Sequence, residues 1–278
     1  MPWLGKVPSH WSVERTKFVA RLESGHTPSR QDPEYWVDCR VPWFTLADVW
    51  QLRDDRVETV FETHEKISEI GLMNSVARLL PAGTVMLSRT ASVGFSAIMG
   101  TDMATPQDFV NWVCGPHLRP EFLLYAFRAM RPEFERLVMG STHQTIYMPD
   151  VGQFVCPVPT RPEQDAIIDW IRRETARLDA LVTKKEPLIE SLQEKRTALI
   201  TRAMTKGLDP SVPMKSAGID GLGVIPVHWQ VRRLKRIAVV RQGITKGRDL
   251  QGRTTIERPY LRVANVQSGR LDLSDVHS

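Results

Sequence analysis

The sequence contains few cysteines, and none of them are paired in a metal-binding spacing. Its 278 residues include three cysteines, Cys39, Cys114 and Cys156, which lie far apart and form no C-x-x-C motif. This spacing argues against a disulfide framework and against a cysteine-based zinc site, and it favours a reduced compartment. No apolar run approaches the ~18–20 residues that a membrane span needs. No apolar h-region follows Met1, so we expect no secretory signal, no membrane partner and a cytoplasmic protein.

The sequence also lacks the common catalytic and cofactor-binding motifs. It has no G-x-x-x-x-G-K-[ST] phosphate loop, no G-x-G-x-x-G turn before a helix and no H-E-x-x-H zinc motif. The Asp/Asn/Ser-Pro-Pro-aromatic run of the usual aminomethylating loop is absent, and so is any Glu-x-Lys tripeptide, which weakens a metal-dependent nuclease hypothesis. None of the seven histidines pairs with another at ligand spacing. We therefore predict no catalytic, cofactor-binding or metal site in this chain.

Charge is distributed unevenly along the chain. Residues 1–160 carry 15 basic and 18 acidic side chains, a net charge of −3, whereas residues 207–278 carry 12 and 6, a net charge of +6. Residues 224–248 contain seven basic side chains and no acidic one. Such a run favours phosphate backbones, although a solvated surface is an equally good interpretation. The acidic balance of residues 1–160 argues against simple electrostatic binding of nucleic acid there.

The chain contains an internal repeat. Residues 5–30 and 223–248 align without gaps and match at eleven of 26 positions, and the similarity resumes between P-W-F-T-L-A-D-V at 42–49 and P-Y-L-R-V-A-N-V at 259–266. A pattern of this kind indicates a second copy of one structural unit. The Pro-x-His-Trp frame recurs in both copies, at His10-Trp11 and His228-Trp229. We interpret it as structural, with the tryptophan as an anchor and the histidine bound to a polar partner.

A long helix is expected between the two copies. Thr160 as N-cap, Pro162 in the first turn and Glu163 at N3 form a helix-start signal, and Gly207 is a C-cap signal. A 3/4 apolar spacing runs between these signals and predicts a helix of some 45 residues, ~65–70 Å long at about 1.5 Å per residue. Pro187 should kink or divide it.

The apolar stripe of this helix predicts a partner helix from another chain or from a part of the protein that this sequence lacks. The alternative is a helix packed on its own domain, which the length disfavours. We call the stripe the seam; its apolar residues are Ile168, Ile171, Leu178, Val182, Ile189, Leu192 and Leu199.

Residues 1–160 have the pattern of an α+β domain with a small sheet. Short apolar runs bounded by Pro, Gly or polar residues predict strands at 41–46, 84–88 and 109–114, and helices are expected at 64–71 and 120–138. Four turn-rich loops in this domain offer amide, hydroxyl and guanidinium groups, at 24–30, 87–94, 105–109 and 140–147. These groups suit base edges and phosphates, and they are also ordinary loop residues.

Taken together, these motifs resemble the specificity subunit of type I restriction–modification systems. The resemblance rests on P-S-H-W-S-V-E-R-T-K, E-S-G-H-T-P, V-P-W-F-T-L-A-D-V, L-L-P-A-G-T-V-M-L-S-R-T-A-S-V-G, T-P-Q-D-F, G-S-T-H-Q-T-I-Y and V-C-P-V-P-T-R-P-E-Q-D-A-I-I-D-W-I, followed by L-I-E-S-L-Q-E-K-R-T-A-L-I. Each motif alone is weak, but their order along nearly the whole chain is specific.

The resemblance implies a fold and a function. It implies a first target recognition domain at 1–160, a conserved coiled-coil-type spacer helix at 161–206, a linker at 207–222 and an incomplete second target recognition domain at 223–278, which repeats residues 5–61. Such a subunit reads a bipartite site in double-stranded DNA and is not itself an enzyme. It positions methyltransferase subunits, which carry S-adenosylmethionine, and a translocating restriction subunit.

Two further expectations follow from the incomplete second copy. The chain is expected to act as a half-subunit that pairs with a second copy of itself through the seam. The alternatives are a truncated assembly or inhibitory subunit that binds the methyltransferase without supporting recognition, a stand-alone DNA enzyme, which the missing motifs disfavour, and a scaffold that does not bind DNA.

Base-reading residues vary within the family, so the resemblance does not identify them. From the four loops we select nine candidate DNA-binding residues: Arg30, Arg89, Thr90, Ser92, Gln107, Thr142, His143, Gln144 and Tyr147.

Overall fold

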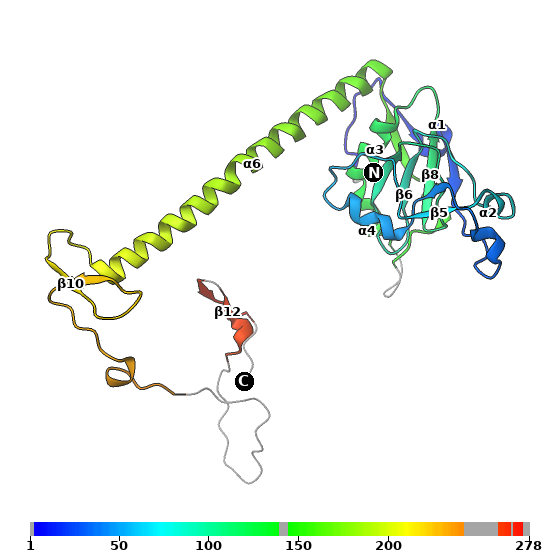
Figure 1. Cartoon of the computed structure of the whole chain (residues 1–278). Helices are drawn as coiled ribbons and strands as arrows, with labels where there is room; N and C mark the ends of the chain where they lie inside the picture. Colours follow the sequence, from blue (N-terminus) through cyan, green and yellow to red (C-terminus); the bar gives the residue numbers. More distant parts are fainter. Residues whose placement is uncertain (1–2, 139–143, 242–260, 268, 275–278) are drawn as a thin grey trace, which may run out of the picture. The chain divides into compact units, whose positions relative to one another are not determined.

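The computed structural model describes residues 3–138, 144–241, 261–267 and 269–274 (Figure 1). The chain divides into two compact units, Met1–Ile189 and Glu190–Ser278, and the division falls within the long helix α6 (Arg161–Lys206). The fold is α+β with small sheets and one long helix, as the sequence predicts. The domain boundaries at residues 160, 206 and 222 stay predictions.

The first unit is built on a five-stranded sheet of order β2-β8-β6-β7-β4. The strands are β2 (Ala20–Ser24), β4 (Thr59–Val60), β6 (Val85–Ser88), β7 (Ser96–Met99) and β8 (Phe109–Cys114). Strand β4 is parallel to β7, and the other neighbours are antiparallel. Every residue of β6 and β7 is buried, which indicates that both faces of the sheet are covered. The predicted strands at 84–88 and 109–114 are confirmed.

Alternate residues along the strands of the sheet pack into two separate apolar cores. Val85, Leu87 and Trp112 belong to the core that also contains α3 (Pro120–Ala129) and α4 (Arg131–Leu137). Met86 and Met99 belong to the other core, which the 3-10 helix η2 (Leu46–Leu52) helps to close. This division follows from the two-residue period of a strand. The predicted helix at 120–138 forms as two helices, and Pro132 at the start of α4 accounts for the break.

A two-stranded ribbon lies beside the main sheet. Strands β3 (Val41–Trp43) and β5 (Glu65–Ile67) pair antiparallel and adjoin η1 (Pro33–Trp36) and α2 (Glu69–Met73). The predicted strand at 41–46 is confirmed over its first three residues. The predicted helix at 64–71 is wrong over its first half, because Glu65–Ile67 pair with β3, and Ser68 caps a shorter helix by accepting a hydrogen bond from Gly71 N at 2.9 Å.

The start of α6 is fixed to the N-terminal motif. Strand β1 (Ser12–Arg15) pairs with β9 (Val155–Val158), and the short α1 (Thr16–Val19) and α5 (Met148–Val151) complete the elements of the unit. The Glu163 carboxylate accepts hydrogen bonds from Thr160 N at 2.9 Å and Thr160 Oγ1 at 2.7 Å. The same carboxylate lies 2.6 Å from His10 Nε2 and accepts from Trp11 Nε1 at 3.2 Å. The predicted helix start is therefore confirmed, and His10 has the polar partner that its structural interpretation requires.

Helix α6 is one continuous helix of 46 residues, about 69 Å long at 1.5 Å per residue. Pro187 lies inside it and does not divide it, because the loss of one backbone hydrogen bond leaves the others of this long helix in place. Gly207, with a φ of 76°, ends the helix as predicted.

Polar contacts hold the first turns of α6 to the domain. Glu58 accepts hydrogen bonds from Tyr125 Oη and, at 2.7 Å, from Arg172 Nη2. Burial alone would raise the pKa of Glu58, but the Arg172 and Tyr125 hydrogen bonds hold it below its ordinary value. Arg119 and Asp165 form a bidentate pair with a shortest distance of 2.6 Å. These contacts link the start of α6 to α3 and to the residue that precedes β4.

The second unit repeats local features of the first. It contains β10 (Met214–Ser216), β11 (Val224–Pro226), η3 (Leu234–Arg236), η4 (Val263–Asn265), β12 (Val266–Gln267) and β13 (Arg270–Leu271). Trp229 N donates to Pro226 O at 2.9 Å, as Trp11 N donates to Pro8 O at 3.0 Å. At the start of η4, Asn265 Oδ1 accepts a hydrogen bond from Arg262 N at 2.8 Å, as Asp48 Oδ2 accepts from Thr45 N at 2.9 Å at the aligned start of η2. These shared turns support the internal repeat.

We predict that Glu163→Gln makes α6 docking less sensitive to acid. The pKa of Glu163 is lowered from 4.5 to about 2, chiefly by its hydrogen bonds to His10 and Thr160. A lowered pKa means that the stabilisation is complete above pH 4.5 and is lost as pH falls through about 2. Urea unfolding midpoints of wild type and variant should therefore differ at neutral pH and converge as the pH drops below 4.5.

The exposed Glu190→Gln removes a carboxylate from the same helix and serves as the control, with a small effect at every pH. A wild-type advantage over Glu163→Gln that stays constant down to low pH would contradict the role of the carboxylate.

Candidate functional site

Antiparallel pairing places three of the four predicted loops at one end of the main sheet. Strand β2 ends at Ser24, which pairs with Val110 near the start of β8, and β6 ends at Ser88, which pairs with Phe109. The loops that leave β2, enter β8 and leave β6 therefore lie at the same sheet end. Their neighbourhood follows from the strand register.

The loop after β2 contacts the loop before β8 directly. His26 N donates to Thr105 O at 3.0 Å, and Thr27 Oγ1 donates to Gln107 Oε1 at 2.8 Å. A Cβ atom on Gly25 would fall well inside van der Waals contact with two carbonyl oxygens of residues 105 and 106 and 2.5 Å from Thr105 Oγ1. Only glycine permits this backbone approach.

The remaining loops continue the same surface. Arg89 N donates to Asp108 O at 2.8 Å, which joins the loop after β6 to the loop before β8. The loop after β6 also contacts the 144–147 segment, because Ala91 N donates to Gln144 O at 2.8 Å and Ile146 N donates to Arg89 O at 2.9 Å. All four predicted loops are thus linked in the order 24–30, 105–109, 87–94 and 144–147. We call this the loop surface.

The predicted DNA-binding residues differ in their availability. Arg30, Gln107, Gln144 and Tyr147 are exposed, whereas Arg89, Thr90 and Ser92 are half-buried. The Arg89 guanidinium donates through Nη1 to Ile146 O at 3.3 Å, so that it also holds the 144–147 segment. The predicted residues Thr142 and His143 lie outside the described residues.

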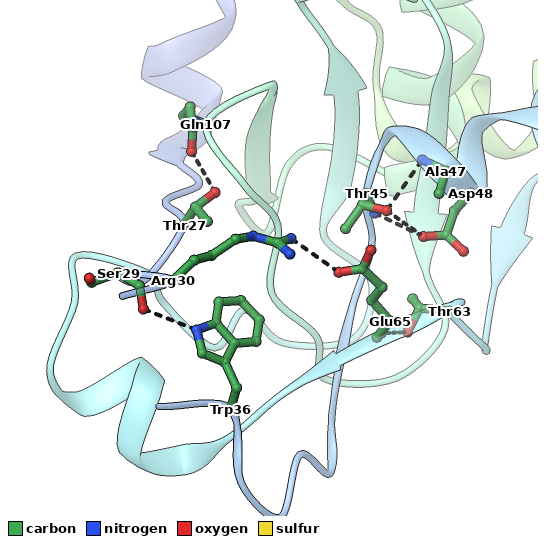
Figure 2. Close-up of polar contacts among 10 residues, drawn as sticks. All are labelled: Thr27, Ser29, Arg30, Trp36, Thr45, Ala47, Asp48, Thr63, Glu65 and Gln107. Atoms are coloured by element: carbon green, nitrogen blue, oxygen red, sulfur yellow. Dashed lines mark hydrogen bonds and ion pairs between the residues drawn. The ribbon is translucent and has the colours of Figure 1, made fainter. Parts of the chain in front are cut away.

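Arg30 is held in a fixed position (Figure 2). Its guanidinium lies 5.0 Å from the Trp36 ring centroid and 5.9 Å from that of Trp43, within cation–π range. Nη2 lies 3.5 Å from Glu65 Oε2, and Trp36 Nε1 donates to Ser29 O at 3.0 Å. Arg30 therefore presents a flat, oriented donor group at the edge of the loop surface.

A buried carboxylate, that of Asp48, fixes the backbone next to the Arg30–Glu65 pair. Asp48 is fully buried and accepts from Thr45 N at 2.9 Å and from His64 N at 2.7 Å. Thr63 Oγ1 in turn accepts from Trp43 N at 3.1 Å and donates to Glu65 O at 2.6 Å. The backbone before Glu65 is thereby fixed.

Sequence reasoning missed Trp36 and Glu65. The local pattern predicts a helix at Glu65, and only its pairing with β3 brings it to Arg30. The cluster of Tyr35, Trp36 and Trp43 around a turn-rich segment was the available signal.

The seam prediction needs one correction. Ile168 is buried in the core of the first unit, because the first two turns of α6 pack on that domain, so it is not available to a partner. Ile171 is half-buried. Leu178, Val182, Ile189, Leu192 and Leu199 are each about half exposed, and every residue from 175 to 202 is exposed. The unpartnered part of the seam therefore begins after Ile171 within the described residues.

The loop surface offers hydrogen-bond donors and acceptors but little charge. In the described part of the chain, no group of three or more His, Cys, Asp or Glu side chains could hold a metal ion. None of the described helices combines the length and apolar character that a bilayer crossing requires. The chemistry that this surface supports is recognition by hydrogen bonds and stacking.

Comparison with known proteins gives consistent matches. The family model described as "Type I restriction modification DNA specificity domain" matches residues 8–191. The MjaIX type I restriction enzyme specificity subunit of Methanocaldococcus jannaschii is 26% identical over 269 residues, 96% of this chain and 60% of that protein. The EcoprrI specificity subunit of Escherichia coli is 22% identical over 156 residues, 54% of this chain and 37% of that protein.

Two solved structures share the fold. A chain described under "Structural basis underlying complex assembly and conformational transition of the type I R-M system" has a TM-score of 0.53 and 18% identity, with 74% of this chain and 48% of that chain covered. The HsdS subunit from Thermoanaerobacter tengcongensis has a TM-score of 0.50 and 16% identity, with coverage of 74% and 47%. The chain thus spans 60% or less of the length of the relatives it matches.

We predict that Gly25→Ala destabilises the loop surface. The added methyl group would meet backbone oxygens of residues 105 and 106 that have no freedom to move, so unfolding should become easier by roughly 1–3 kcal/mol or more. Chemical denaturation of the full chain measures the change. Gly152→Ala is the matched control, because its Cβ would lie 3.5 Å from its nearest neighbours. Equal stabilities of the two variants would contradict the close approach.

Proposed function

The chain belongs to the family of type I restriction modification DNA specificity domains, and from this premise we propose that it reads double-stranded DNA as the specificity subunit of a type I restriction–modification complex. In this proposal it catalyses no reaction. It positions methyltransferase subunits, which bind S-adenosylmethionine, and a restriction subunit on a bipartite site. The complex works in the cytoplasm.

The observation that carries the proposal is the joining of four loops at one sheet end. Gln107 and Gln144 place exposed amides there, Arg30 a guanidinium and Tyr147 an exposed phenol ring. Amides and guanidinium groups form bidentate pairs with adenine and guanine in the major groove. Backbone hydrogen bonds between the loops hold these side chains in register, which is the preorganisation that base reading requires.

The charge of the domain favours recognition within a complex. Residues 1–160 carry a net charge of −3, so counterion release from phosphates contributes little to their affinity for DNA. We infer that discrimination between bases comes from the loop surface and that much of the affinity comes from the partner subunits. Selection of DNA from a random pool therefore requires the assembled complex.

Helix α6 supplies the spacing between two reading units. Its exposed apolar residues after Ile171 repeat at the 3/4 spacing that a second helix covers in a coiled coil. We propose that this second helix comes from a second copy of the chain or from a further part of a longer specificity subunit, and that the two reading units contact the two halves of the site.

The deciding experiment selects DNA from a random pool with the chain assembled on its methyltransferase subunits. We expect one enriched bipartite motif, and Gln107→Ala should bind the selected DNA roughly 5- to 150-fold more weakly. Its overall stability should change little, because Gln107 is exposed and loses only the side-chain bond from Thr27. Gln153→Ala, at an exposed position outside the four loops, is the control.

Two results would count against the proposal. An intact complex that enriches no motif would show that the chain occupies the methyltransferase without supporting recognition. A motif that binds Gln107→Ala as well as wild type would remove Gln107 from the reading set.

We predict that Leu192→Asp abolishes pairing through the seam. A carboxylate at this position would be buried without a partner in a helix–helix contact, whereas in the free chain it stays exposed. Light scattering at micromolar concentration, with and without the methyltransferase, measures the association. Ala180→Asp introduces the same charge about half a turn away from the seam and should leave association intact. A wild-type chain that stays monomeric in both conditions would contradict the pairing.

A further inference from the structure

We propose that Arg30 reads a guanine and that Glu65 determines how selectively it does so. In the free protein Glu65 holds the Arg30 guanidinium against Trp36, and the O6 and N7 acceptors of a guanine replace the carboxylate on binding. The inference rests on the proposed reading function and adds to it one base, its reading residue and a residue that suppresses contacts with other DNA.

The two indole rings fix the plane of the guanidinium. Trp36 and Trp43 lie with their ring centroids 5.4 Å apart, and the Arg30 guanidinium lies within 6 Å of both. The bond from Trp36 Nε1 to Ser29 O ties the outer indole to the loop that carries Arg30. A planar donor with a fixed orientation suits a bidentate acceptor, such as the O6 and N7 edge of guanine.

The side chain of Glu65 lies on the same face of the β3–β5 ribbon as that of Trp43. The two residues are cross-strand partners in the β3–β5 pair, and cross-strand partners point to the same face. The backbone of residues 63–65 is held by Asp48 and Thr63, as described above. The Glu65 side chain remains 38% exposed and the Arg30 side chain 67% exposed. DNA can therefore reach the pair, and the carboxylate returns to one place when DNA leaves.

The Arg30–Glu65 ion pair is weak enough for a guanine to replace the carboxylate. Arg30 and Glu65 touch through a single contact of 3.5 Å, and an exposed ion pair of this kind changes an equilibrium by about fivefold at most. A bidentate arginine–guanine contact discriminates by roughly 5- to 150-fold, so the guanine displaces the carboxylate. Adenine presents an amino donor where guanine presents O6. Because the guanidinium has only donors, a contact with adenine does not replace the lost contact with the carboxylate.

Non-specific DNA gains less from Arg30. Its phosphates must displace the same carboxylate, and because they are negatively charged Glu65 also repels them, whereas the O6 and N7 edge of guanine is neutral. Glu65 therefore lowers non-specific binding more than specific binding. It acts on DNA through Arg30, as a positioning residue that raises the specificity ratio.

The test uses the complex with methyltransferase subunits and four forms of the chain: wild type, Glu65→Gln, Arg30→Lys and the control Glu133→Gln. The control removes an equal charge from an ion pair on α4, where Glu133 and Arg136 lie 2.6 Å apart. Binding to the selected DNA and to random DNA is measured over a salt series, and each form also undergoes selection from the random pool.

We expect Glu65→Gln to bind random DNA about two- to fivefold more tightly at low salt, with a smaller change for the selected DNA. Arg30→Lys should retain binding to random DNA but lose the preference for guanine at one position of the selected motif. The Glu133→Gln control should shift both affinities little and equally.

Three outcomes overturn parts of the argument separately. If Glu65→Gln changes both affinities equally and no more than Glu133→Gln, the carboxylate does not set specificity. If Arg30→Lys selects the wild-type motif, Arg30 does not set the preference at that position and the guanine assignment is wrong. If the wild-type complex selects no motif, the reading function itself fails, and the inference fails with it.

Discussion

The pairing of β8 with both β2 and β6 is the constraint on which the rest of the structure depends. This interior strand contributes Trp112 to one core and Phe109 to the other, and both side chains are fully buried. Its register with β2 and β6 decides which chain segments leave the sheet at the same end. The loop surface is therefore a consequence of packing in the sheet interior, and its side chains are positioned by elements that contact no DNA in our proposal.

Local signals in the sequence predict the elements that local chemistry decides. The apolar runs of β6 and β8 are bounded by polar and turn residues, and Thr160 with Glu163 marks the start of α6. The repeat was also visible, and the shared turns at Trp11 and Trp229 now give a physical reason for it. Composition alone marks the four loops in the sequence and does not indicate that they lie together, which the strand register and the bonds between the loops show.

Long-range pairing explains what the sequence did not reveal. Residues 64–71 have helical character, but pairing with β3 turns 65–67 into a strand and brings Glu65 to Arg30. Ile168 matches the apolar period of the seam equally well whether it faces a partner or its own domain, and only the fold shows that it lies in the core. Arg89 likewise reads as a free loop cation until its bond to Ile146 is seen.

The interlocked loops have a consequence for how a new target sequence could evolve. Gly25 abuts residues 105 and 106, Gln107 bonds to Thr27, and Ala91 bonds to Gln144, so that a change of length or backbone in one loop displaces its neighbours. Single substitutions would thus show strong epistasis. Exchange of the complete loop set on an unchanged sheet is the more accessible route, and it would alter specificity in one large step.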